Sequence, residues 1–441
     1  MTNHAPNAFL LALFAVNVGA APPPPAATYR VIVYLTSQNQ GPIGIGQGSP
    51  GLFYSQNGNI ISVTTQGTVN TLATFPDPPY TVESYPVAAA NGLAYSSIDQ
   101  IGSGGGSANV FSVNSTPGSE LTYPVQSLAP VIAGNLPNGI LFGVAYGFTG
   151  GPPDFATVDL AGNVAPLYQF PSGDRPGAPI YGADGDYYGT SQPAAGGGNA
   201  YFYRLPPSEA FPKLVTLPFV TTDFLGGGLV LQGTDGNFYG IQSTGLGCSS
   251  DNPHGGVYKL TLSGQYTLLH DFGVCGKAVV NSLIEASDGK LYGTIQGTSV
   301  LFSLTKSGDY RVVFNTTNGL TQGVCQCTLV QGSDGIIYGT AVGGGPSNFG
   351  VIFALDAGLP APKPRAQEFT PKAGAVGGQV QIWGQNLLAA SVQFDGVAAT
   401  QVSNSGPNYV LATVPVGATT GPITVTTPGG TVTTKAKFTV K

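Results

Sequence analysis

Short runs of apolar residues, separated by turn-forming residues, follow one another along most of this chain, and one unit recurs at a nearly regular interval. In its clearest copies an Asp-Gly pair precedes an aromatic run that ends in Tyr-Gly. These copies are Asp184–Gly189, Asp235–Gly240, Asp288–Gly293 and Asp334–Gly339. Weaker copies have their glycine at positions 51, 92 and 139, and successive copies are spaced from 41 residues (51 to 92) to 53 residues (236 to 289). Such a period, with several short strands in each unit, predicts the blades of a β-propeller or another β array.

Each unit contains four strand-like runs that are rich in β-branched and aromatic residues. In one copy these runs are Gly228–Leu231, Phe238–Tyr239, Val257–Leu260 and Gln265–Leu268. The Asp-Gly pair between the first and second runs favours a tight hairpin, since both residues tolerate positive φ. A longer segment separates the second run from the third. The pattern therefore predicts four-stranded blades with tight turns on one face and longer loops on the other.

The last unit has three runs, which end at Leu355, and its fourth run is found at the other end of the chain. Residues 28–34 are similar to the fourth run at 309–314. We therefore expect the N-terminal strand to complete the last blade and to close the ring, leaving short and protected sheet edges. The predicted fold of residues 29–355 is a seven-bladed β-propeller. Six or eight blades are the alternatives, because the first copy is the most degenerate.

The repeat stops after residue 355. Residues 356–366 contain three prolines, at 360, 362 and 364, which indicates a semi-rigid linker. Short strand patterns separated by turn signals then fill residues 367–441 and predict a β-sandwich, so the whole chain is expected to be all-β. Trp383, on an early strand of this unit, is expected to pack in its core.

Residues 369–440 resemble the IPT/TIG family of immunoglobulin-like domains. The matching segments are Phe369–Pro371, Val380–Leu387, Val392–Gly396, Val414–Gly421 and Phe438–Val440. The resemblance implies an immunoglobulin-like β-sandwich for residues 367–441.

The repeats between Leu229 and Leu355 resemble the GloVer-type tandem repeats of bacterial exported proteins. The shared pattern is Leu-Val-x-Gly-(Ser/Thr)-Asp-Gly-x-x-Tyr-Gly followed by Gly-Val-(Ile/Tyr)-(Phe/Lys). This resemblance implies a propeller-like protein that is secreted or attached to the cell surface.

The N-terminal segment has the composition of a secretory signal. The first 29 residues contain no Asp, Glu, Lys or Arg, and the apolar run Phe9–Gly19 precedes small residues at 20 and 21. We predict a signal peptide at residues 1–21 and a proline-rich leader at 22–28. A core strand is the alternative for the apolar run. No stretch of the chain is long enough to span a membrane as a helix, and we expect a secreted or cell-surface protein.

Charge argues against a nucleic-acid partner. Residues 1–358 contain 9 Lys+Arg against 19 Asp+Glu, and residues 359–441 contain 6 against 2, which together give the net charge of −6. An acidic ring provides no electrostatic surface for nucleic acid. An extracellular glycan or protein is the expected partner, and the protein is expected to be a monomer.

The four cysteines suit an oxidising compartment. They are Cys248, Cys275, Cys325 and Cys327. The strand pattern places all four on the long-loop face of two neighbouring blades, and three pairings are possible. We favour a Cys248–Cys275 disulfide, which would stabilise the fold by about 2–4 kcal/mol. A zinc site is the alternative, although the Cys-x-Cys spacing is not that of structural zinc sites.

Catalytic motifs are absent from the sequence, and we expect no metal and no cofactor. There is no Ser-His-Asp set, HExxH motif or P-loop. The repeated turn aspartates 184, 235, 288 and 334 are explained by hairpin geometry, with calcium binding as the alternative. The repeated tyrosines 188, 239, 292 and 338 are expected to pack between blades, with ligand stacking as the alternative.

Loops on a rigid scaffold usually carry function, so the long-loop face is the expected ligand surface. The candidate ligand-binding residues are Tyr80, Tyr85, Asp99, Asp174, Asp223, Asp251 and His254. Aromatic and carboxylate side chains suit sugars or peptides, and equally an ordinary soluble surface. We predict a non-catalytic binding or structural protein. The alternative is an extracellular carbohydrate-active enzyme that uses carboxylates on the same face.

Overall fold

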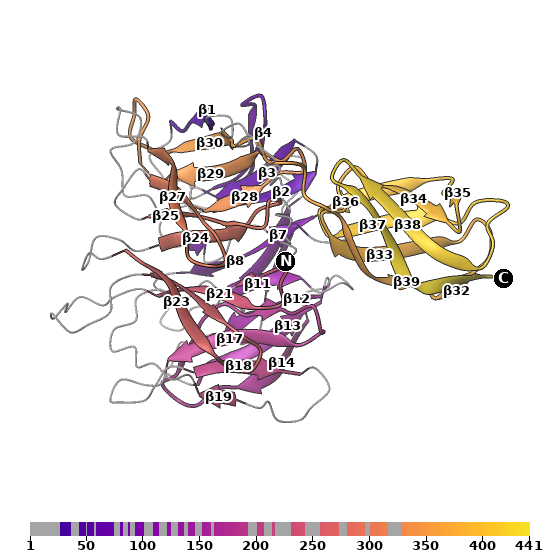
Figure 1. The fold of residues 1–441 in the computed structure, drawn as a ribbon, viewed down its shortest axis with the longest axis horizontal. Coiled ribbons are helices and arrows are strands. Elements are labelled where there is room, and N and C mark those ends of the chain that lie inside the picture. Colours follow the sequence, from indigo (N-terminus) through magenta and orange to yellow (C-terminus); the bar gives the residue numbers. More distant parts are fainter. Residues whose placement is uncertain are drawn as a thin grey trace, which may run out of the picture.

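The computed structural model describes the chain in segments. These are residues 27–36, 44–49, 51–56, 59–74, 80–82, 87–88, 93–100, 109–113, 121–124, 131–135, 140–145, 152–159, 163–192, 201–206, 214–216, 231–242, 256–272, 280–295, 300–315, 328–341 and 343–441. Within them the regular secondary structure consists of β-strands, which form nine sheets (Figure 1). The all-β prediction is confirmed. No helix long and apolar enough to cross a membrane occurs in the part of the chain described here.

Seven of the sheets are built from the described residues up to Asp356, and they are numbered here along the chain. Sheet 1 contains β2 (Gly44–Ser49), β3 (Leu52–Gln56), β4 (Asn59–Thr64) and β5 (Val69–Thr74). Sheet 2 contains β6 (Tyr80–Val82), β7 (Val87–Ala88), β8 (Ala94–Gln100), β9 (Asn109–Val113) and β10 (Leu121–Pro124). Sheet 3 contains β11 (Val131–Asn135), β12 (Leu141–Ala145), β13 (Asp154–Val158) and β14 (Val164–Gln169). Sheet 4 contains β15 (Arg175–Pro176), β16 (Ile180–Tyr181), β17 (Tyr187–Gln192), β18 (Tyr201–Leu205) and β19 (Leu214–Thr216).

The other three sheets of this region follow the same plan. Sheet 5 contains β20 (Leu231–Gln232), β21 (Phe238–Gln242), β22 (Gly256–Leu260) and β23 (Tyr266–Asp271). Sheet 6 contains β24 (Val280–Glu285), β25 (Leu291–Ile295), β26 (Val300–Leu304) and β27 (Tyr310–Asn315). Sheet 7 contains β28 (Leu329–Gln331), β29 (Ile337–Ala341), β30 (Val351–Asp356) and β1 (Thr28–Tyr34). The strands pair antiparallel in this order, and in sheets 2 and 4 two short strands share the first position.

Sheet 7 joins strands from opposite ends of the repeat region. Strand β1 pairs antiparallel with β30, and the register runs from Thr28 opposite Asp356 to Tyr34 opposite Val351. The predicted position of the N-terminal strand beside the last three-stranded unit is therefore present. The Tyr29 ring stacks on Phe314 of sheet 6, with ring centroids 4.6 Å apart. Residues near the start of the chain thus contribute to the packing of its sixth and seventh units.

The second strands hold the sheets together, because their side chains are buried on both sides. All five residues of β25 and of β29 are buried. Tyr239 belongs to one cluster with residues of sheet 6, and Tyr338 to one with residues of sheet 1. The rings of Tyr338 and Phe53 lie 4.2 Å apart. The prediction that the repeated tyrosines pack between sheets is confirmed for these positions.

The fourth strands form the outer edges, and most of them contain a bulge. The register skips one residue in β1, β5, β14, β23 and β27. The skipped residues are Ile32, Leu72, Leu167, Leu269 and Val313. A bulge bends an edge strand and interrupts its unpaired ladder, which disfavours pairing with another chain.

The described C-terminal residues form two further sheets. Sheet 8 contains β31 (Arg365–Thr370), β33 (Gln379–Gln385), β37 (Tyr409–Thr413) and β36 (Val402–Gly406). Sheet 9 contains β32 (Ala373–Gly374), β39 (Gly430–Val440), β38 (Gly421–Thr427), β34 (Ser391–Phe394) and β35 (Val397–Ala398). One hydrophobic cluster includes Ile382 and Val410 from sheet 8 and Phe394 and Phe438 from sheet 9. Trp383 is buried against Tyr409, outside this cluster.

The C-terminal sheets contact the repeat region near sheets 1 and 7. Strand β36 contacts β2 (Figure 1). Gln47 and Ser333 line a small cavity together with Asn386 and Leu388. The Ser287 hydroxyl donates a hydrogen bond to the carbonyl of Pro360, in the segment that joins the two regions. The proline-rich segment is therefore bonded to the repeat region.

Candidate functional site

The structure describes only part of the predicted ligand surface. Tyr80 lies in β6 and Asp99 in β8, which pair with each other, so these two backbone positions are brought together. Asp174 lies just before β15. Tyr85, Asp223, Asp251 and His254 lie outside the described residues, and so do the four cysteines Cys248, Cys275, Cys325 and Cys327.

Asp174 is buried inside sheet 4. It is 7 % exposed, and its carboxylate accepts a hydrogen bond from the Tyr201 hydroxyl. Burial, followed by this hydrogen bond, raises the pKa of Tyr201 above its ordinary value of 10.0, so the phenol keeps its proton. The neighbouring Arg175 is exposed. In this structure the Asp174 carboxylate therefore serves the packing of its own sheet.

The repeated Asp-Gly turns contain a hydrogen bond that turn propensity alone did not predict. In each, the tyrosine hydroxyl of the second strand donates to the turn aspartate, with oxygen–oxygen distances of 2.6 Å in sheet 4, 2.7 Å in sheets 5 and 7 and 3.1 Å in sheet 6. The pairs are Tyr188–Asp184, Tyr239–Asp235, Tyr292–Asp288 and Tyr338–Asp334. The other carboxylate oxygen accepts the backbone N–H two residues on. Both carboxylate oxygens of each aspartate therefore accept a hydrogen bond within the turn.

In sheets 4, 5 and 7 a glycine two residues before the aspartate makes room for this pair. A Cβ added at Gly233 would lie 2.7 Å from both Asp235 Oδ1 and the Tyr239 ring. Sheet 6 has Ala286 at this position, and it is also the sheet with the longest tyrosine–aspartate hydrogen bond. The spacing Gly-x-Asp-Gly-x-x-Tyr was thus a readable signal for the bond, once the strand register is known.

A second hydrogen bond links neighbouring sheets and is called here the latch. A side-chain carbonyl or carboxylate in a first strand accepts the backbone N–H of a turn residue in the preceding sheet, at 2.7 to 3.2 Å. The donor and acceptor pairs are Ala183 with Gln232, Thr234 with Glu285, Ser287 with Gln331, and Ser333 with Gln47. The last pair joins sheet 7 to sheet 1 across most of the chain.

In the latch between sheets 5 and 6 the acceptor is a charged carboxylate. Glu285 replaces the usual glutamine, and its carboxylate lies 2.8 Å from Lys306 Nζ. Lys306 Nζ also lies 3.5 Å from Asp235. Burial raises the pKa of Asp235, but hydrogen bonds from Asn237 and Tyr239 and the charge of Lys306 outweigh this, so its net pKa lies below 3.8. The group is an ion-pair network at a sheet boundary.

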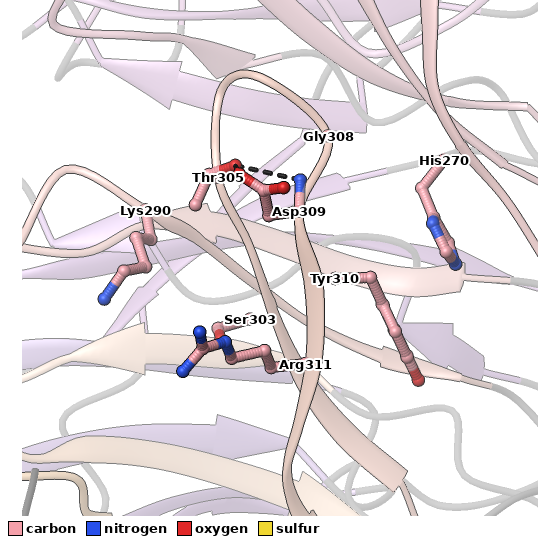
Figure 2. A pocket seen from close by; sticks show the side chains of 8 residues that line it. All are labelled: His270, Lys290, Ser303, Thr305, Gly308, Asp309, Tyr310 and Arg311. Atoms are coloured by element: carbon pink, nitrogen blue, oxygen red, sulfur yellow. Dashed lines mark hydrogen bonds between the residues drawn. The ribbon is translucent and has the colours of Figure 1, made fainter. Parts of the chain in front are cut away.

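One pocket lined by described residues follows the outer edge of sheet 6 and encloses about 700 Å³ (Figure 2). Its lining residues are His270, Lys290, Ser303, Thr305, Gly308, Asp309, Tyr310 and Arg311. The His270 and Tyr310 rings are stacked, with centroids 4.4 Å apart. Burial lowers the pKa of His270 and Asp271 opposes this shift, so the imidazole is held in its neutral form more strongly than a free histidine.

Two titratable groups of this pocket, His270 and Asp309, both contact neighbouring residues. His270 stacks on Tyr310 and on the edge of Phe272. Asp309 accepts hydrogen bonds from Thr305 and Ser307. No group of three or more His, Cys, Asp or Glu side chains that could hold a metal ion occurs in the described segments.

The comparison with protein families gives a match in the repeat region. The family described as Gloeobacter/Verrucomicrobia repeat matches residues 175–375. That span includes the described strands of sheets 4, 5 and 6, all of sheet 7 except β1, and the C-terminal strands β31 and β32. The chain is a tandem-repeat protein with a β-propeller-like fold.

Three solved structures similar to this tandem-repeat protein are distant from it in sequence. Streptogramin B lyase has a TM-score of 0.52 at 14% identity, covering 75% of this chain and 97% of that one. Virginiamycin B lyase from Staphylococcus aureus has a TM-score of 0.54 at 14% identity, with 75% and 99% covered. Its catalytically inactive form with quinupristin has a TM-score of 0.51, with the same identity and coverage. At this identity the likeness concerns the fold alone. No match was found among the curated proteins.

Proposed function

We propose that this tandem-repeat protein is an exported, non-catalytic binding or structural protein whose ligand, a carbohydrate or a protein, meets the long-loop face. The observation that carries the proposal is the contrast between the two ends of the sheets. At the tight-turn end the recurring polar groups of sheets 4 to 7 are used in internal hydrogen bonds. At the other end the connection between second and third strands runs over 243–255 in sheet 5 but over 296–299 in sheet 6. A constant scaffold with variable connections is typical of ligand-binding folds.

The proposed ring has seven blades and is closed by β1. Two observations support closure: the β1–β30 pairing, and the latch between Ser333 and Gln47, which repeats the geometry of the latches between consecutive sheets. First strands of neighbouring sheets also contact each other, as β2 does with both β28 and β7. A closed ring would give the long-loop face a fixed shape.

We further propose an IPT/TIG immunoglobulin-like identity for the C-terminal unit, and export by the N-terminal signal. Two sheets that share one hydrophobic cluster support the first proposal. The uncharged N-terminal sequence supports the second, although residues 1–26 lie outside the described part of the chain. Export would allow the disulfide proposed for Cys248 and Cys275 to form.

A glycan array, probed with the purified protein and followed by a turnover assay on every glycan that binds, tests the function. We expect binding without release of shorter products. Asp99→Asn and Asp223→Asn variants should weaken binding, while Asp334→Asn, at the opposite end, should leave it unchanged. Hydrolysis or elimination that is lost in the first two variants would replace the binding proposal by the enzymatic alternative.

A further inference from the structure

A pair of cations on the outer part of sheet 6 has no counterpart in sheet 5. Lys290 and Arg311 occupy the positions that Asn237 and Thr267 hold in sheet 5, since both pairs stand at the same distance from the Asp-Gly turn and the fourth-strand tyrosine. Residues 1–358 contain only 9 Lys+Arg against 19 Asp+Glu. Two cations lining one pocket are therefore unusual for this acidic region.

The strand register puts these cations on one face of sheet 6. Ser303 is opposite both Tyr292 and Arg311, so the three side chains project from the same face. Lys290 is two residues before Tyr292 and shares that face. Figure 2 shows Lys290, Ser303 and Arg311 on one side of the β26–β27 hairpin, with Tyr310 and His270 on the other. Tyr292 belongs to the cluster that packs against sheet 7, so the cationic face is the one directed toward sheet 7.

In sheet 7 the residue equivalent to Arg311 has a partner that Arg311 lacks. Arg30, also the residue after the first tyrosine of a fourth strand, donates to the carbonyl of Thr65 at 3.2 Å. Thr65 lies in the turn between the third and fourth strands of sheet 1. Sheet 7 has no such turn, because its third strand ends at Asp356 and its fourth begins at Thr28. Across the described segments, Arg311 has neither a hydrogen-bond nor an ion-pair partner.

Lys290 and Ser303 also have hydrogen-bond donors that a ligand could use. The Lys290 ammonium, which has three donors, contacts one carboxylate, Asp288, at 2.8 Å. Ser303 is 7 % exposed, and its hydroxyl makes no hydrogen bond within the described residues. The carboxylate in the lining of this pocket, Asp309, accepts hydrogen bonds from Thr305 and Ser307 in its own turn. The free donors therefore outnumber the free acceptors.

We propose that Lys290, Ser303 and Arg311 form a binding site for an acidic oligosaccharide, with Arg311 and Lys290 holding its carboxylate or sulfate group. A guanidinium presents paired donors that match such oxyanions, and an ammonium adds a second charge. The pocket encloses about 700 Å³, and the Ser303 hydroxyl beside the two cations offers a hydrogen bond to a sugar unit next to the anionic group. This site is on the strands of sheet 6, away from the long-loop face, and it does not depend on the function proposed for that face.

The test is isothermal titration of the full-length protein with three oligosaccharides of equal length. These are a hexuronic acid oligomer, a sulfated oligomer and a neutral oligomer. At low salt we expect at least one anionic oligomer to bind and the neutral one to bind more weakly. The double variant Lys290→Asn/Arg311→Thr, which copies sheet 5, should lose affinity by about tenfold or more. The relative affinity of the two anionic oligomers identifies the preferred group.

Two controls keep the result specific to this pocket. Lys259→Gln removes one positive charge from sheet 5, outside the pocket, and should leave the affinity unchanged. The reverse double variant Asn237→Lys/Thr267→Arg should add no second site, because in sheet 5 the turn of the next sheet brings Gly308 against the Leu269 carbonyl. The proposal is wrong if neither anionic oligomer binds, if the sheet 6 variant binds as well as the natural protein, or if the sheet 5 variant binds twice as much ligand.

Discussion

At the scale of single residues, the repeated polar side chains act as structural braces. Asp235 accepts both the Tyr239 hydroxyl, at 2.7 Å, and the backbone N–H of Asn237. Gly236 has a φ of 81°, a conformation that glycine adopts without strain. Each turn thus combines a backbone requirement, met by glycine, with a buried hydroxyl that needs an acceptor.

Removing one such hydroxyl should be measurable. Tyr239→Phe leaves the ring in place and removes the hydrogen bond to Asp235, so we expect a loss of about 1 kcal/mol in the free energy of unfolding. Urea denaturation measures this. The matched variant Tyr292→Phe should lose less, because its bond to Asp288 is 3.1 Å long. Equal losses would show that bond length does not control the contribution.

His270 should make stability depend on pH. Burial lowers its pKa below the ordinary value of 6.5, with a smaller opposing effect of Asp271. The unfolded chain therefore binds this proton at a higher pH than the folded chain, and acidification through 6.5 favours unfolding. We expect the difference in unfolding free energy between about pH 7.5 and about pH 5.5 to be smaller in His270→Phe, which retains an aromatic ring beside Tyr310. An unchanged pH dependence would contradict this.

At the scale of elements, each four-stranded sheet depends on its neighbours. The second strands β25 and β29 are buried on both faces, and the latches bind the first strands of sheets 1, 5, 6 and 7 to the turn of the preceding sheet. The Gln331 side chain shows how one residue serves both tasks. Its Oε1 accepts the Ser287 N–H from sheet 6 at 2.9 Å, and its Nε2 donates to Gly335 in its own turn at 3.0 Å.

Truncation of this latch should destabilise two sheets together. Gln331→Ala leaves a partly buried N–H of Ser287 without its acceptor, and we expect a loss of about 1–3 kcal/mol in unfolding free energy. Gln331→Glu keeps the acceptor for the Ser287 N–H but removes the Nε2 donor to Gly335, so it separates the contributions of the two hydrogen bonds. Hydrogen exchange should rise in both β24 and β28 of the alanine variant. Exchange confined to sheet 7 would indicate that the latch does not couple the two sheets.

At the scale of the whole molecule, sheet 7 is where the two ends of the repeat region meet. Strand β1 covers the outer edge of β30 from Asp356 to Val351. The C-terminal sheets lie beside the latch between Gln47 and Ser333. Both arrangements bring distant parts of the chain to the same place.

Deletion of residues 28–34 should expose this edge. The unpaired groups of β30 would then offer a template for another chain, so we expect lower thermal stability and self-association. Sedimentation velocity measures the association, and Val31→Thr, which retains a β-branched residue in β1, serves as the control. A monomeric deletion variant with unchanged thermal stability would rule out an important role for β1.

The sequence predicted more of the fold than of the candidate site. Period, turn residues and strand composition predicted the all-β repeat and the borrowed strand, because hairpins and strand patterns are local properties. For the predicted site the outcome depends on the residue. Asp174 is buried against Tyr201, and Tyr80 and Asp99 lie on paired strands. The other predicted residues lie outside the described part of the chain, and these are Tyr85, Asp223, Asp251 and His254. Burial of one carboxylate depends on packing partners that its own segment does not specify.

The sequence by itself determined where the chain turns and which residues repeat, since Asp-Gly turns and alternating strands require only near neighbours. The tertiary structure alone decided which polar groups remain available. It paired Tyr239 with Asp235 and Gln331 with Ser287, and it left Arg311 without the turn carbonyl that Arg30 contacts. The physical reason is that a hydrogen bond needs its partner within about 3 Å, and the strand register and the neighbouring sheet, rather than the local sequence, set that distance.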